Sequence, residues 1–209
     1  MKDWAELTNA GKLRRISSLA ASAMDLYDID VARMHLYCFA TNPLYAVHTT
    51  DGERFILRMA YPGWRTLENL EAEAMWLDAL DRDTDIGAPK VIRSKNGLAV
   101  LPMKNSGIPK TWNATLMTWL PGRLLAHYLT STNLEKMGEL LAKLHVHGKS
   151  WEPPEGFSER QFCHFISRGE PDALFSGDTA ENFNRDNREV FVRIRDRVEA
   201  EYAGLDKED

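Results

Sequence analysis

Residues 34–81 constrain the fold most, because three extended runs are followed there by one amphipathic helix. Met34–Ala40 and Leu44–Thr50 flank a short Thr-Asn-Pro turn, and Arg54–Ala60 follows Asp51-Gly52. An Asp-Gly pair between two runs of strand-forming residues is a strong indicator of a two-residue hairpin. We therefore expect three consecutive antiparallel strands.

Two amphipathic helices are expected around these strands, over residues 8–26 and 66–81. In each of them, apolar residues recur at intervals of three and four, which places them on one side of a helix. Acidic side chains follow other sides of the second helix, among them Glu68, Glu71 and Glu73. The pattern thus indicates one helix before and one helix after the three strands.

A second hairpin is expected where Asn96-Gly97 joins Lys90–Arg93 to Leu98–Met103. Residues 104–113 are expected to form a loop. Ala114–Leu120 is the last extended run, and a Pro-Gly pair ends it.

The chain turns helical after this point. Thr132-Asn-Leu-Glu135 and Ser158-Glu-Arg-Gln161 each match a capping box, in which a side-chain hydroxyl caps the start of a helix. A last helix is expected over about residues 181–203. The pattern predicts an α+β fold with residues 1–118 as an N-terminal lobe and 119–209 as part of a helical C-terminal lobe.

The composition excludes several classes of function. The chain has 209 residues and a formal net charge of -5, which disfavours nonspecific binding to nucleic acid, because such binding needs a basic face. No run approaches the roughly 18 apolar residues of a membrane span, and the acidic N-terminal segment does not fit a secretory signal. Cys38 and Cys163 form no disulfide framework, so a cytoplasmic, reducing environment is expected.

Five short segments carry a family resemblance through their order and spacing. They are Asn42-Pro-Leu-Tyr-Ala-Val47, Phe55-Ile-Leu-Arg58, Glu73-Ala-Met-Trp-Leu-Asp-Ala-Leu80, Trp119-Leu-Pro-Gly122 and Leu140-Leu-Ala-Lys-Leu-His145. Together they resemble the aminoglycoside phosphotransferase superfamily, which includes homoserine and choline kinases. The resemblance implies a protein-kinase-like fold, in which an antiparallel five-stranded small lobe with an inserted helix precedes a helical large lobe. It also implies transfer of phosphate from ATP to the hydroxyl group of a small molecule.

The resemblance also implies roles for particular residues. Arg58 on the third strand and Glu73 on the helix would hold the nucleotide phosphates, and Asn42 would lie in the turn that covers them. Protein kinases use Lys rather than Arg at the strand position, although the planar guanidinium also suits phosphate and carboxylate. Met117 and Trp119 would lie in the hinge strand that receives adenine. ATP and Mg²⁺ are the expected cofactors.

Each of these residues also has a purely structural interpretation. Arg58 could be a solvated charge at a sheet edge, and Glu68 or Glu71 could occupy the position expected of Glu73. Asn42-Pro43 is a common turn dipeptide, and no glycine-rich phosphate loop surrounds it. The hinge residues also fit ordinary core packing.

The histidines and the polar segment near the C-terminus do not indicate a metal or catalytic site. His145 and His147 are two positions apart, so they do not face one another on a helix and make a poor chelate. We expect both to be structural. Asp178 and Asn182 are four residues apart rather than five and have no preceding His, so they do not fit a catalytic loop.

The chain contains no HxDxxxxN catalytic loop, which protein kinases use to orient the acceptor hydroxyl and to hold Mg²⁺. We therefore expect this chain to be the nucleotide-binding part of a small-molecule kinase and to be inactive on its own. It would be either a part of a longer kinase or a natural short protein. The alternative is a non-catalytic kinase-like module that binds a nucleotide or a protein partner. These residues do not specify the acceptor. A partial helical lobe would leave apolar faces uncovered, so a homodimer is a further hypothesis.

Overall fold

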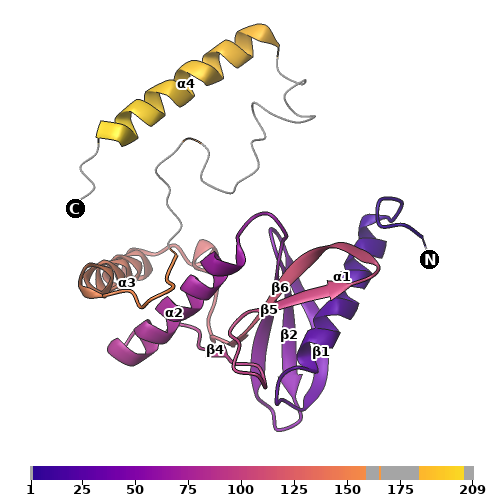
Figure 1. The fold of residues 1–209 in the computed structure, drawn as a ribbon. Helices are drawn as coiled ribbons and strands as arrows, with labels where there is room; N and C mark the ends of the chain where they lie inside the picture. The colour runs from indigo at the N-terminus through magenta and orange to yellow at the C-terminus, as the bar shows by residue number, and fades with distance from the viewer. Residues whose placement is uncertain (1, 159–164, 166–183, 205–209) are drawn as a thin grey trace.

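The computed structural model describes residues 2–158, 165 and 184–204, which form an antiparallel sheet with a helix on each face and two further helices after it (Figure 1). The sheet in this part of the chain has six strands, which equals the number of extended runs in the sequence and is one more than the family resemblance implies. Its order is β1-β2-β3-β6-β4, and β5 also pairs with β6. The expected α+β class is confirmed.

The first three strands follow the expected pattern. They run antiparallel in sequence order, as β1 (Val31–Phe39), β2 (Pro43–Thr49) and β3 (Arg54–Ala60). The turn between β2 and β3 contains Gly52 with a φ of 92°, a left-handed conformation that glycine adopts without strain. Helix α1 (Asn9–Met24) precedes β1, and the hydroxyl of Thr8 caps its first turn.

The second half of the sheet differs from the expectation. Its elements are α2 (Leu67–Asp83), β4 (Val91–Ile92), β5 (Leu101–Asn105) and β6 (Ile108–Thr118). Asn96-Gly97 does form a turn, but the expected hairpin is wrong, because β4 and β5 each pair with β6 and not with one another. The loop expected over residues 104–113 is also wrong. Ile108 and Trp112 are buried in the core beside α1, which favours an extended β5–β6 hairpin there.

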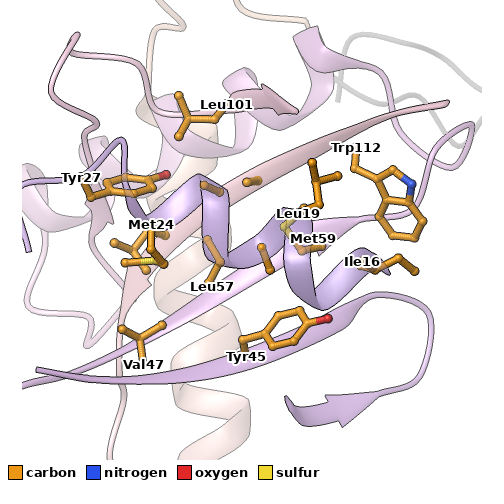
Figure 2. Packing of buried hydrophobic residues seen from close by; sticks show 14 of the residues in the cluster. Ile16, Leu19, Met24, Tyr27, Tyr45, Val47, Leu57, Met59, Leu101 and Trp112 are labelled. Carbon is orange, nitrogen blue, oxygen red and sulfur yellow. The ribbon is translucent and has the colours of Figure 1, made fainter. Parts of the chain in front are cut away.

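The larger part of the core lies between α1 and the sheet. Leu19 and Met24 of α1 approach Leu57 and Met59 of β3 in this cluster (Figure 2). Successive residues of a strand point to opposite faces, so Arg58, between these two, points to the other face. A smaller cluster on that face joins α2 to β3, β4 and β6.

Two helices follow the sheet, namely α3 (Ser131–Ser150), which comes after the short 3-10 turn η1 (Leu125–His127), and α4 (Arg185–Gly204). The first expected capping box is wrong by two residues, because the hydroxyl of Thr130, not that of Thr132, caps α3. The capping box expected over residues 158–161 extends outside the described residues. Cys163 and the segment around Asp178 also lie outside them.

Helix α3 is exposed over most of its surface. His147 is its only buried residue, and four apolar side chains are between 40% and 46% exposed, namely Leu134, Met137, Leu140 and Leu141. A homodimer through this surface stays a prediction. In the part of the chain that the structure describes, no helix has the length and apolar character needed to cross a membrane.

Candidate functional site

An ion pair between β3 and α2 forms the centre of the candidate site. Nη1 and Nη2 of Arg58 donate hydrogen bonds to Oε1 and Oε2 of Glu73, at 2.9 and 2.7 Å. Two parallel bonds of this kind are the strong form of an Arg–carboxylate contact. The two side chains are 14% and 28% exposed, respectively. The pair is therefore largely withdrawn from solvent, and Arg58 is not a solvated charge at a sheet edge.

The structure selects Glu73 among the three glutamates considered for this position. Glu68 is exposed in the first turn of α2, where hydrogen bonds from its own backbone and from the Thr66 hydroxyl lower its pKa. Glu71 lies two positions before Glu73 and so points to a different side of the helix. Arg65 adds a second positive charge, with its Nη1 4.0 Å from Oε2 of Glu73.

The environment of Glu73 favours its ionised form. Burial alone would raise the pKa of this carboxyl group, but the hydrogen bonds and charge of Arg58, with the charge of Arg65, outweigh burial and hold the pKa below the ordinary value of 4.5. A carboxylate whose folded-state pKa is depressed stabilises the fold at neutral pH. That contribution is lost as the pH falls from the ordinary value through the lower folded-state value.

We expect the Glu73→Gln variant to lose less stability than the wild type when the pH is lowered from about 6 to about 3, because glutamine has no charge to lose. Urea unfolding at a series of pH values measures this difference. Glu71→Gln is the matched control and should keep the wild-type pH dependence. An equal loss of stability in the wild type and in Glu73→Gln would contradict an ionised Glu73 held by Arg58.

Thr115 on β6 belongs to the site, and the sequence analysis missed it. Thr115 pairs with Arg58 across the sheet, so both side chains lie on the α2 face. Nε of Arg58 and Oγ1 of Thr115 are buried, and neither has a hydrogen-bond partner among the described residues. Buried polar atoms are costly unless they are paired. These two atoms therefore mark a place suited to a polar ligand atom or a water molecule.

Asn42 lies in the turn between β1 and β2, as the sequence indicated. Its side-chain Oδ1 accepts a hydrogen bond from the backbone N–H of Tyr61 at 2.8 Å. This bond ties the turn to the segment that leaves β3. The amide nitrogen of Asn42 and the backbone of the turn are the groups that could contact a phosphate, so that role stays a prediction.

Met117 and Trp119 have different environments at the end of β6. Met117 is 8% exposed and packs in the cluster beside α2. The backbone N–H groups of Thr118 and Trp119 donate to carbonyl oxygens of Lys90 and Arg54, at 2.9 and 3.2 Å. Both N–H groups are therefore already used within the protein. A base that binds this segment would find its hydrogen bonds at the following backbone groups or at carbonyl oxygens.

The indole ring of Trp119 contacts two further residues that the sequence analysis missed. The guanidinium of Arg54 lies 4.0 Å from the centre of the ring, and Tyr37 packs against the ring edge to face, with 5.0 Å between ring centroids. A cavity of about 670 Å³ adjoins this stack, between the start of β3 and the Pro121-Gly122 turn. The stack depends on the pairing of strands, which no local sequence pattern reveals.

His147 links α3 to α2. Nε1 of Trp76 lies 3.3 Å from Nδ1 of His147, and Nε2 of His147 lies 3.4 Å from Oδ2 of Asp83. An indole nitrogen only donates, so Nδ1 accepts and the neutral ring carries its proton on Nε2. The buried ring thus has a structural role. In the described part of the chain, no group of three or more His, Cys, Asp or Glu side chains is arranged to hold a metal ion.

Comparison with known proteins places this arrangement in a family. The model of the phosphotransferase enzyme family (APH) matches residues 40–203, which include every residue of the site described above except Tyr37. The chain belongs to the phosphotransferase enzyme family. The uncharacterized protein sll1119 of Synechocystis sp. is 30% identical to it over 129 residues, which are 61% of this chain and 34% of that protein.

Solved structures share the fold of this phosphotransferase-family chain. The microcompartment-associated aminopropanol kinase matches with a TM-score of 0.61 and 24% identity, over 79% of this chain and 48% of that one. The amicoumacin kinase hAmiN, solved in complex with AMP-PNP, Ca²⁺ and Ami, matches with a TM-score of 0.69 and 16% identity, over 95% and 57%. The expected kinase-like fold is confirmed. The chain spans between about a third and somewhat over half of the length of these relatives.

Proposed function

We propose that this chain is the nucleotide-binding part of an ATP-dependent kinase that phosphorylates the hydroxyl group of a small molecule. The Arg58–Glu73 pair carries the proposal. A guanidinium has more N–H donors than the two that Glu73 occupies, so Arg58 can bind phosphate while α2 holds it in place. Membership of the phosphotransferase family supports this reading, as does the likeness in fold to proteins named as kinases.

The spacing along β3 suits an extended nucleotide. Arg54 and Arg58 lie on the same face of this strand, four residues apart, which corresponds to about 13 Å. Adenine would lie at the Trp119 end, beside Met117, and the phosphates would reach Arg58. Asn42 and its turn would cover the phosphates. In this proposal residues 1–118 form the nucleotide lobe, and the segment that follows begins the lobe that binds the acceptor.

The residues present do not fit a magnesium site. Protein kinases hold Mg²⁺ with an Asp and an Asn that follow the catalytic His-Arg-Asp sequence, and this chain has no HxDxxxxN segment. The described residues contain no cluster of carboxylates that would replace it. No step of the proposal therefore depends on Mg²⁺ held by this chain.

A second candidate is a kinase-like module that binds nucleotide or a protein partner without turnover. Both candidates require a working nucleotide site if the ligand is ATP. Phosphate transfer to small hydroxyl compounds separates them in a protein that also carries an HxDxxxxN segment, since only the first candidate predicts ADP release there that depends on an acceptor.

The direct test is isothermal titration of the chain with ATP, with and without Mg²⁺, for the wild type and for Arg58→Ala. We expect the variant to bind ATP about 10- to 100-fold more weakly, which corresponds to the loss of one charge-assisted contact. Arg14→Ala removes the same charge from an exposed position of α1 and should bind as the wild type does. Equal affinities in the wild type and Arg58→Ala would refute the phosphate role of Arg58.

A further inference from the structure

Part of the sheet face that carries Arg58 is not packed against α2. In the described part of the chain, the cluster beside α2 takes its strand residues from β3, β4 and β6, and none from β1 or β2. Cross-strand partners lie on the same face of a sheet. Residues of β1 and β2 that share the face of Arg58 therefore form a surface next to the candidate site.

Four basic side chains gather on this surface, across three neighbouring strands. Arg33 of β1 pairs with His48 of β2, and His48 pairs with Arg54 of β3. His35 lies two residues after Arg33 and so on the same face. Its ring stacks on that of His48, with 5.5 Å between the ring centroids and 16° between the planes. We call these four residues the basic cluster.

The basic cluster has no acidic partner. Within the described residues, none of its members forms a salt bridge with a carboxylate. The acidic side chains nearest in sequence are the exposed Asp30 before β1 and two residues of the β2–β3 hairpin, Asp51, which accepts a hydrogen bond from the hydroxyl of Thr49, and Glu53, which is exposed. In addition, Nδ1 of His35 is buried without a hydrogen-bond partner among the described residues.

The positive charges of the cluster repel one another, which disfavours the charged form of His48. Desolvation, followed by the positive charges of Arg54, His35 and Arg33, lowers the pKa of His48. Like charges held together raise the free energy of the charged state. A bound anion would offset that repulsion, so anion binding would lower the electrostatic free energy of the cluster.

Arg54 is already oriented for such a ligand. Its guanidinium stacks on the ring of Trp119 at 4.0 Å. Stacking occupies the flat face of a guanidinium and leaves the N–H donors at its edge available. One member of the cluster thus presents a fixed fork of donors instead of a flexible charge.

We propose that the basic cluster binds a phosphate group at a site separate from Arg58. Two guanidinium forks match the oxygens of a tetrahedral anion, and the imidazoles of His35 and His48 add donors when they are protonated. The backbone positions of Arg54 and Arg58 are about 13 Å apart along β3, and the first guanidinium is held on Trp119 whereas the second is held on Glu73, so the cluster and Arg58 form separate contacts for a phosphate. The phosphate is either free or carried on the nucleoside end of a ligand, and both sources share the same chemistry.

The test is an NMR titration of the full chain with inorganic phosphate at constant ionic strength, following the imidazole resonances of His35 and His48. We expect a saturable shift and a raised pKa of His48, because the anion offsets the charges of Arg33, His35 and Arg54. Arg33→Gln should weaken phosphate binding about tenfold, which corresponds to the loss of one charge-assisted hydrogen bond. Lys110→Gln makes the same charge change at an exposed position of β6 and should have no effect.

The Arg58→Ala variant separates this proposal from the proposed nucleotide site, because phosphate should still shift His35 and His48 with wild-type affinity. A shift that disappears in Arg58→Ala would place the phosphate at Arg58 and overturn the proposal, as would the absence of any saturable shift in the wild type. Adenosine 3′-monophosphate distinguishes the two sources. Binding tighter than that of inorganic phosphate and of adenosine, and weakened by Arg33→Gln, indicates a nucleoside phosphate at the cluster, whereas binding no tighter than that of inorganic phosphate indicates free phosphate.

Discussion

Replacing Glu73 with alanine should destabilise the fold by about 2 kcal/mol, because the variant leaves the guanidinium of Arg58 without its carboxylate in a largely buried position. Breaking a fully buried ion pair costs about 3–5 kcal/mol, whereas an exposed pair contributes less than about 1 kcal/mol. The two side chains are 14% and 28% exposed, between these limits. Urea unfolding at neutral pH measures the loss. Glu71→Ala is the control and should stay within about 0.5 kcal/mol of the wild type.

A double variant, Arg58→Met with Glu73→Leu, separates the stability of this pair from its proposed function. Apolar residues of similar volume can replace a buried ion pair without loss of stability, so the double variant should unfold near the wild-type urea concentration. It should nevertheless bind ATP as weakly as Arg58→Ala. If the double variant were as unstable as Glu73→Ala, an unpaired guanidinium would not be the cause of the loss. If it bound ATP normally, the pair would not be the phosphate contact.

The sequence predicted the parts of the fold that local chemistry determines. The β2–β3 hairpin was predicted correctly from Asp51-Gly52, because the glycine permits the left-handed turn and the residues of β3 alternate over most of the strand between a buried face and a less buried one. The helix α2 was also predictable, since its apolar side has helical spacing and Thr66 caps it. In these segments every residue that determines the structure lies within a few positions of the others.

Strand pairing after α2 could not be predicted in the same way. Asn96-Gly97 forms its turn as expected, but the segments on either side of it pair with β6. β6 is an 11-residue strand that pairs with β3 on one side and with β4 and β5 on the other. The central place of β6 in the sheet allows Trp112 and Leu116 to be buried in the same core cluster as α1. The residues around β6 do not indicate this contact, because α1 lies far away in the sequence.

In the candidate site, too, some residues could be found from the sequence, whereas others are brought together only by strand pairing. Family resemblance singled out Arg58 and Glu73, and the structure joins them by two hydrogen bonds, although phosphate binding by Arg58 stays a prediction. Thr115 was missed because its place opposite Arg58 follows from strand register alone. The basic cluster was missed for the same reason, since Arg33, His48 and Arg54 are brought together by pairing across two hairpins.

Leu57→Ala should cost about 3 kcal/mol of stability. Leu57 has no exposed surface and lies in the core between the sheet and α1. For a chain of this size the loss corresponds to a fall of about 6–12 °C in Tm, which thermal unfolding measures. Leu124→Ala is the matched control, because Leu124 is 71% exposed, and its Tm should stay within about 2 °C of the wild-type value.

The functional consequence of Leu57→Ala follows from the alternation of β3. Leu57 is adjacent to Arg58 in the chain, but its side chain points to α1 while that of Arg58 points to α2. At a temperature where the variant is folded, its affinity for ATP should therefore match that of the wild type, in contrast to Arg58→Ala. If Leu57→Ala weakened ATP binding as much as Arg58→Ala does, the nucleotide affinity would depend on the stability of the whole sheet, and the ion pair would not be a dedicated phosphate contact.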